Sequence, residues 1–193
     1  ATKSFETLND DDFLQRKLIF LSKAYGNVFV DLGIVGENGD QVAYAGPHGL
    51  ANVNYADADW FKKAWQNNFY ISDVFLGIRG TPHFIITVKQ KEAGRWYLVR
   101  STIDFMSFNS LVQNLRVGRT GHAFILNRAG KFQTQPTMDI SSDPGDYNFL
   151  WEAVLKKRTH ILVTRRADEA GKDSMYAVGS LKNGDWLLVV KQE

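Results

Sequence analysis

The pattern of hydrophobic and polar positions in the first half of the chain predicts a hairpin, a helix and three further strands. Residues 28–35 and 41–45 have strand composition, and the Asn38-Gly39 pair between them is typical of a tight turn because both residues tolerate positive φ. Apolar residues recur at helical spacing over 57–67, which predicts a short amphipathic helix. Its buried positions are expected to be Trp60, Phe61, Ala64 and Trp65. The strand-like segments that follow are 69–76, 84–90 and 96–103.

The second half repeats this series of elements in the same order. A strand at 122–127 and a short segment at 131–135 flank a turn, and a helix is predicted at 148–157. The strand-like segments after this helix are 159–165, 174–181 and 186–191. Landmarks separated by about 90 positions are Gly39 and Gly130, Pro47 and Pro136, and Trp96 and Trp186. Internal similarity at one offset predicts two copies of one structural unit.

The order of elements in each half is that of a PAS-like module. We therefore expect an α+β fold of two tandem PAS-like modules, each a five-stranded antiparallel sheet with a helical and loop cover, preceded by a long N-terminal helix at 10–25. The expected domains are an N-terminal helix (1–26), a first module (27–104), a connecting helix (105–117) and a second module (118–193). The alternative is one irregular α+β domain whose halves resemble each other by chance.

Composition and charge narrow the classes of function. The chain has 193 residues, of which 44% are hydrophobic, so it can bury a sizeable core. Its 23 basic and 21 acidic residues leave a net charge of +2, which gives no support to nucleic-acid binding. The absence of cysteine excludes disulfides and cysteine nucleophiles. No stretch of the sequence approaches the roughly 20 apolar residues of a membrane helix.

The runs Tyr70–Gly77 and Thr81–Ile86 resemble the membrane-distal module of the extracytoplasmic sensor domains called double Cache, or tandem PDC, domains. Asn54-Tyr55 with Asp59–Phe61 is similar to the pocket-side loop and helix of that module. The segment Gly121–Asn127, with Gly130 and Gln133-Thr134, resembles the start of the membrane-proximal module. The resemblance covers nearly the whole chain.

This resemblance implies the periplasmic part of an inner-membrane receptor, in which one membrane helix precedes the first helix and another follows the final strand. The expected parent is a two-component sensor histidine kinase, with a chemotaxis receptor or a cyclic-dinucleotide enzyme as alternatives. The fragment itself is expected to be non-catalytic and to bind a small-molecule metabolite in its distal module. Amino-acid-sensing members have an arginine two residues before the helix tryptophan, where this chain has Ala58, so amino-acid sensing by that arrangement is not expected.

The candidate ligand-binding residues all lie in the first module. They are Tyr55, Trp60, Tyr70, Ser72, Asp73, Arg79, His83, Arg100 and Asp104. Strand alternation predicts that Tyr70 and Ser72 share one face while Asp73 takes the other. Arg100 and Asp104 are expected to share a face, where they could form an ion pair. If either is buried in the pocket, it could hold an anionic or zwitterionic ligand by charge-assisted hydrogen bonds. We expect a closed cavity between a cover at 46–60 and a sheet at 70–104, although these aromatic residues could simply be core.

No residue pattern predicts catalysis, a cofactor or a metal. The four histidines have no ligand partner at helical or strand spacing, and no nucleotide-binding, hydrolase or zinc-protease signature occurs. A soluble α+β enzyme or cofactor-binding protein remains the alternative class. The helix at 10–25 is apolar beyond one narrow stripe, which predicts a homodimer through this helix or, alternatively, packing of the helix against its own module.

Overall fold

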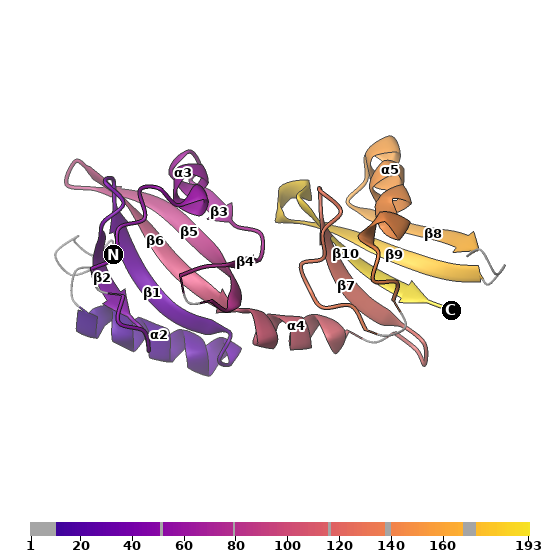
Figure 1. Cartoon of the computed structure of the whole chain (residues 1–193), viewed down its shortest axis with the longest axis horizontal. Helices are drawn as coiled ribbons and strands as arrows, with labels where there is room; N and C mark the ends of the chain where they lie inside the picture. Colours follow the sequence, from indigo (N-terminus) through magenta and orange to yellow (C-terminus); the bar gives the residue numbers. More distant parts are fainter. Residues whose placement is uncertain (1–10, 51, 79, 116, 138–139, 168–172) are drawn as a thin grey trace. The chain divides into compact units, whose positions relative to one another are not determined.

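The computed structural model describes residues 11–50, 52–78, 80–115, 117–137, 140–167 and 173–193 (Figure 1). The chain divides into two compact units, Ala1–Ser107 and Phe108–Glu193. The boundary between them falls within helix α4 (Phe105–Gln113). Each unit contains its own antiparallel sheet, as the internal repeat predicts, and the α+β fold is confirmed.

The first unit is built on a sheet in which the first and last long strands are neighbours. Its strands are β1 (Phe29–Gly36), β2 (Gln41–Ala45), β3 (Phe69–Ile71), β4 (Phe75–Leu76), β5 (Pro82–Glu92) and β6 (Arg95–Asp104). They run in the order β2-β1-β6-β5-β3, and β4 pairs with β5. The expected strand at 69–76 is thus two short strands, because the chain leaves the ladder at Ser72–Val74. This sheet has six strands rather than the predicted five.

Different elements cover the two faces of the first sheet (Figure 1). Helix α2 (Asp11–Tyr25) buries one stripe against β1 and β2, with Phe13, Leu14 and Leu18 packed on Leu32, Ile34, Ala43 and Ala45. The other face carries α3 (Asp59–Trp65), whose buried residues are Trp60, Phe61 and Ala64, as the helical spacing predicts. The first unit therefore consists of a sheet between α2 and a cover formed by α3 and its preceding loop.

The second unit has a similar sheet with two strands fewer among the described residues. Its elements are β7 (His122–Asn127), the short 3-10 helix Pro144–Tyr147, α5 (Asn148–Lys157), β8 (Ile161–Ala167), β9 (Asp173–Leu181), a 3-10 turn at Lys182–Gly184, and β10 (Trp186–Gln192). The strand order is β7-β10-β9-β8, which again places the first strand beside the last. Helix α5 has the predicted bounds and buries Leu150, Trp151 and Val154, whereas Leu155 is exposed.

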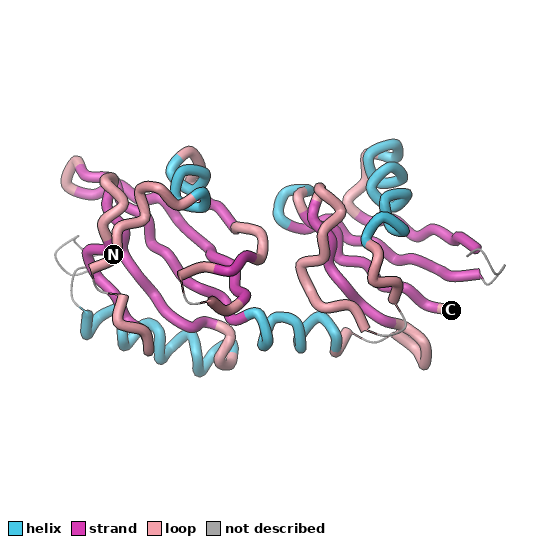
Figure 2. Tube along the Cα trace, viewed as in Figure 1, coloured by secondary structure: helices cyan, strands magenta, loops and turns pink. Residues whose placement is uncertain are grey.

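The predicted five-stranded count is wrong for the second sheet, which has four strands among the described residues. The segment expected as its second strand, 131–135, forms a loop with one isolated bridge, between Leu126 and Phe132 (Figure 2). Two backbone bonds join the segments, from the Asn127 N–H to the Lys131 carbonyl and from the Gln133 N–H to the Ile125 carbonyl, and side chains take the place of the others. The Ile125 N–H donates to Thr134 Oγ1 at 2.9 Å, and the Lys131 N–H donates to Asn127 Oδ1 at 2.9 Å. Since these two donors are satisfied by side chains, a regular strand does not form.

Candidate ligand-binding site

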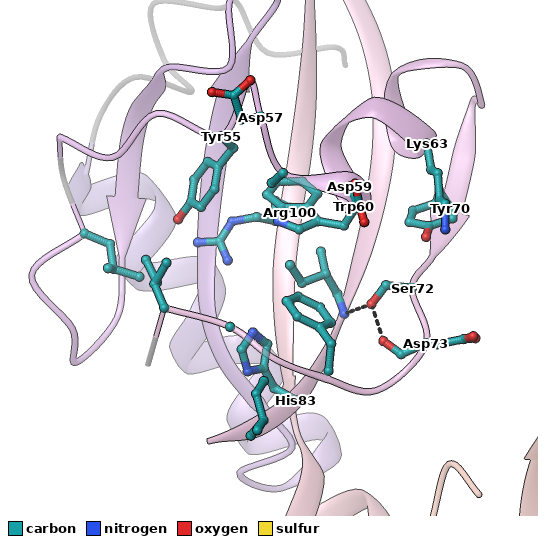
Figure 3. A pocket seen from close by; sticks show the side chains of 17 residues that line it. Tyr55, Asp57, Asp59, Trp60, Lys63, Tyr70, Ser72, Asp73, His83 and Arg100 are labelled. Atoms are coloured by element: carbon teal, nitrogen blue, oxygen red, sulfur yellow. Dashed lines mark hydrogen bonds between the residues drawn. The ribbon is translucent and has the colours of Figure 1, made fainter. Parts of the chain in front are cut away.

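A pocket of about 600 Å³ lies in the first unit, between the sheet and the cover that contains α3 (Figure 3). The polar and charged lining residues are Asp57, Asp59, Lys63, Ser72, Asp73, His83 and Arg100. Aromatic walls come from Tyr55, Trp60, Tyr70 and Phe75. The remaining lining residues are Leu50, Ala58, Leu76, Gly77, Ile78 and Ile85. Apolar walls with a few convergent polar groups are typical of small-molecule sites.

Arg100 forms the floor of this pocket. It lies on the central strand β6 and is only 2% exposed. Its Nη1 donates to Thr102 Oγ1 at 2.8 Å and lies 3.4 Å from Oδ1 of Asp31, which is fully buried. Its Nη2 donates to Gln41 Oε1 at 3.0 Å. The guanidinium also lies over the Tyr55 ring, with its carbon 5.4 Å from the ring centroid. Arg100 is therefore held in one orientation by three polar partners and one ring.

A β-bulge brings Gln41 to this group. In the β1–β2 register Ile34 faces Ala43, but Val35 faces Gln41, so β2 has one extra residue at Val42. The extra residue moves Gln41 from the α2 face of the sheet onto the face that α3 covers. Its Nε2 donates to the Leu50 carbonyl in the cover loop, while its Oε1 accepts from Arg100. Gln41 thus joins the floor of the pocket to its cover.

Gly33 leaves space for the guanidinium. This residue faces Arg100 directly across the β1–β6 ladder. A Cβ at position 33 would lie 2.8 Å from Gln41 Oε1 and 3.3 Å from Arg100 Nη2. Both distances are shorter than ordinary van der Waals contact, so a larger residue would displace the Arg100–Gln41 hydrogen bond.

A row of directly paired residues crosses the face of the first sheet that α3 covers, at the level of Arg100. Its members are Tyr44, Gly33, Arg100, Thr87 and Tyr70, one from each of β2, β1, β6, β5 and β3. In the second sheet, the row through the buried centre of β10 is wholly apolar. Its members are Phe124, Val189, Val178 and Leu162. The polar floor is therefore a property of the first unit.

Aromatic side chains occupy the space above the second sheet. Tyr147 is 2% exposed, and its ring centroid lies 4.7 Å from Phe124 and 6.5 Å from Tyr176. Burial raises the pKa of Tyr147 to about 12, because a phenolate would lose its hydration there. The hydroxyl accepts a hydrogen bond from the Ser141 N–H at 3.0 Å. The equivalent region of the second unit is thus packed as a core.

Seven of the nine residues predicted from the sequence line the pocket. They are Tyr55, Trp60, Tyr70, Ser72, Asp73, His83 and Arg100. Arg79 lies outside the described residues. Asp104 does not line the pocket. Its Oδ2 accepts from the Ser107 N–H at 2.7 Å and so caps the start of α4. The predicted Arg100–Asp104 ion pair is wrong, and the carboxylate that pairs with Arg100 is Asp31.

Two further expectations about the pocket are corrected. Asp73 lines the pocket together with Tyr70 and Ser72, because β3 ends at Ile71 and strand alternation does not continue beyond it. Its carboxylate nevertheless extends away from Arg100 (Figure 3). The pocket is open to solvent rather than closed, since Leu76 is 70% exposed and Ile78 is 69% exposed.

Ser72 and His83 are held by their own hydrogen bonds. Ser72 Oγ accepts from the Ile85 N–H at 2.9 Å and donates to the Asp73 carbonyl at 2.8 Å. His83 Nδ1 lies 2.8 Å from the Thr81 carbonyl, which can only accept, so this nitrogen carries a proton. The ring also packs 4.6 Å from Phe75, and Gly77 fits against it. These contacts fix the shape of the lower wall.

The sequence interpretation missed Asp31, Gln41, Asp57 and Lys63, and it placed Asp59 on the pocket-side helix without naming it as a ligand-binding candidate. A signal existed for Asp31, because it is the one charged residue in the apolar run 28–35. A buried charge requires a partner of opposite sign, and Arg100 is the lone arginine of the strand 96–103. No signal existed for Gln41, whose position depends on the bulge.

No three His, Asp or Glu side chains among the described residues lie close enough to hold a metal ion. No helix among the same residues is both long and apolar enough to cross a membrane.

Comparisons with solved structures reveal similar folds at low sequence identity. The extracellular domain of rpHK1S-Z16, a protein assigned as a histidine kinase, matches with a TM-score of 0.66 and 14% identity over 98% of this chain and 78% of that chain. The ligand-binding domain of the amino acid chemoreceptor PctB from Pseudomonas aeruginosa PAO1, in complex with L-Gln, matches with a TM-score of 0.61 and 16% identity, covering 96% and 77%. The ligand-binding domain of Mlp24 with asparagine matches with a TM-score of 0.54 and 14% identity, covering 95% and 79%.

The chain has the double Cache fold. These structures match it across both units, which confirms the fold that the sequence resemblance implies. No family model and no curated protein matches the sequence. Identities this low show a shared fold and do not indicate which ligand this chain binds.

Proposed function

We propose that this double Cache domain is the extracytoplasmic small-molecule sensor of a transmembrane signalling receptor, and that its ligand binds in the pocket of the first unit. The observation that carries the proposal is the contrast between the two units. The first combines a 600 Å³ pocket with a buried arginine in its floor, whereas aromatic residues fill the equivalent region of the second. The proposed ligand site comprises the seven lining residues predicted from the sequence. Arg79, which lies outside the described residues, stays a candidate from the sequence alone.

The proposed role is sensing without catalysis. Arg100 is enclosed by fixed hydrogen bonds, Ser72 Oγ bonds backbone groups on both sides, and His83 Nδ1 is committed to Thr81. A nucleophile needs a base within hydrogen-bond reach, and none of these pocket contacts is such a pair. The fold similarity to histidine-kinase and chemoreceptor domains supports a sensor as well.

We propose a two-component histidine kinase as the parent protein, with the first unit as the membrane-distal module. Ligand binding would draw the cover toward the sheet and change the position of α2, which leads directly into β1. This is a shift between two populations of conformers, so the ligand must bind one of them more tightly. Hydrophobic segments of about 20 residues encoded on both sides of this domain would support membrane anchoring, and their absence would contradict it.

The proposal is tested by a thermal-shift screen of small carboxylates, amines and sugars, followed by calorimetry on each compound that raises the melting temperature. The decisive variants are Trp60→Leu on α3 and Trp151→Leu on α5. The two residues are 7% and 9% exposed, so both substitutions open a cavity and lower stability. We expect Trp60→Leu to abolish ligand binding and Trp151→Leu to preserve it. The reverse result would place sensing in the second unit.

A further inference from the structure

The charged residues that line the pocket are predominantly acidic. Asp57 and Asp59 are exposed at its rim, and Asp73 completes a set of three lining carboxylates. Arg100 lies in the floor, but the Asp31 carboxylate 3.4 Å away balances its charge. Outside that pair, Lys63 is the one cation among the described lining residues. Arg79 is close in sequence, and even with its charge included the carboxylates are in excess.

The floor is poorly suited to an anionic ligand. A carboxylate binds arginine best through two parallel N–H bonds. Here Nη1 is engaged by Thr102 and Asp31, and Nη2 is engaged by Gln41. The remaining N–H groups are the Nε–H, which has no hydrogen-bond partner among the described residues, and the second N–H of Nη2. The Nε atom is buried, and a carboxylate that reached these groups would lie near the like charge of Asp31.

The walls are suited to a cation. Four aromatic side chains, Tyr55, Trp60, Tyr70 and Phe75, line the pocket. An aromatic face attracts a cation through its quadrupole, and the attraction grows when water is excluded. The pocket already uses this interaction once, since the Arg100 guanidinium lies over Tyr55. Trp60 packs against Tyr55 with the ring centroids 5.0 Å apart, and Tyr70 lies on the far side of the pocket from Arg100 (Figure 3).

We infer that the ligand is a small organic cation that carries no carboxylate, such as a primary amine or a quaternary ammonium compound. Its positive group lies among Trp60, Tyr70 and Phe75 within the field of the rim carboxylates. Where the molecule also carries a hydroxyl or carbonyl oxygen, as choline does, this acceptor takes the Nε–H of Arg100. This inference rests on the pocket being the sensing site, as proposed above, and goes further by assigning the sign of the ligand charge.

Binding is tested with choline, tetramethylammonium and putrescine, against succinate, L-glutamine and glucose. We expect at least one of the three cations to raise the melting temperature by about 5–10 °C when present at about 100 times its Kd. We expect no shift with the other three compounds. Absence of a shift with all three cations would overturn the inference. Trp60-dependent binding of succinate, L-glutamine or glucose would overturn it while leaving the pocket established as the sensing site.

Two charge variants are expected to change the affinity for the cation in opposite directions. Asp59→Asn removes a rim carboxylate and should weaken binding of the cation about two- to five-fold, whereas Lys63→Gln removes a competing cation and should strengthen it by a similar factor. Both residues are exposed, so stability without ligand should change little. Asp146→Asn, at an exposed acid of the second unit, is the control and should leave affinity unchanged. Stronger binding to Asp59→Asn than to Lys63→Gln would refute a cationic ligand.

Discussion

Arg100 Nη1 lies 3.4 Å from Asp31 Oδ1, and the two side chains are 2% and 0% exposed. Asp31 Oδ1 also accepts from the Thr102 N–H at 3.1 Å, and the Asp31 carbonyl accepts from Ser101 Oγ at 2.8 Å. The pair therefore joins β1 to β6 beneath the pocket. A buried ion pair is costly to desolvate but far more costly to leave half-complete.

Replacing one partner of this pair should destabilise the fold strongly. We expect Asp31→Asn to lower the free energy of unfolding by about 3–5 kcal/mol, because it leaves the Arg100 charge buried without a counter-charge. Asp31→Asn with Arg100→Met should recover part of this loss. The control is Asp185→Asn, which breaks the exposed pair between Arg128 and Asp185 and should cost less than about 1 kcal/mol. Equal losses in urea denaturation for the two single variants would contradict the argument.

A methyl group at position 33 should disturb the same cluster. We expect Gly33→Ala to cost about 1–3 kcal/mol, because its Cβ would push Gln41 Oε1 away from Arg100. Gly179→Ala is the matched control, since Gly179 also lies in a strand but no atom lies within 4 Å of its added Cβ. Gly179→Ala should be neutral or slightly stabilising. Thermal denaturation of both variants measures the difference, and a harmless Gly33→Ala would refute the close packing.

The raised pKa of Tyr147 predicts a loss of stability at high pH. Its pKa is about 12 in the folded protein, against an ordinary value of 10.0. The unfolded chain therefore releases this proton first as the pH rises above 10. The folded state then loses about 2–3 kcal/mol progressively up to pH 12. Tyr147→Phe should lose less stability over this interval, although it costs about 1 kcal/mol at neutral pH through the unpaired Ser141 N–H.

The control for this pH dependence is Tyr25→Phe, at a tyrosine that is 64% exposed. Its denaturation curves should follow those of the wild type between pH 10 and 12. Parallel losses for Tyr147→Phe and the wild type in guanidinium denaturation would show that Tyr147 contributes nothing to the alkaline transition.

The outer side of α2 leads us to propose a homodimer. Phe20 is 64% exposed and Ile19 is 46% exposed, whereas Leu14 is 3% exposed and packs in the core of the first unit. Phe20→Glu should weaken dimerisation roughly 100-fold, because two copies of the side chain leave the interface. Leu14→Glu should instead unfold the unit. Leu155→Glu, at an exposed leucine of α5, is the control. A wild type that sediments as a monomer at all concentrations would exclude the dimer.

Local patterns in the sequence were sufficient to predict many elements of both units. The helix at Asn148–Lys157 and the strands Gln41–Ala45 and His122–Asn127 have the predicted bounds, because periodicity and turn residues act over a few positions. The repeat was also visible in the sequence, although one landmark misled. Trp96 lies near Lys89 on the face of the first sheet that α3 covers. Trp186 lies on the other face of its own sheet, because its neighbour Leu187 is buried in the core beneath α5. Spacing by residue number does not distinguish the two faces of a strand.

The sequence by itself determined most of the element order, the two sheets and seven of the residues that line the pocket. Only the tertiary structure decided how the polar floor is paired. Asp31 and Arg100 lie on strands β1 and β6, which are paired in the sheet but stand near opposite ends of the first unit's sequence. A one-residue bulge at Val42 directs Gln41 toward them. The end of β3 at Ile71 likewise places Asp73 at the pocket against simple alternation. These features depend on strand register, which arises from packing between distant segments, whereas helical and strand periodicity arises from neighbours in the chain.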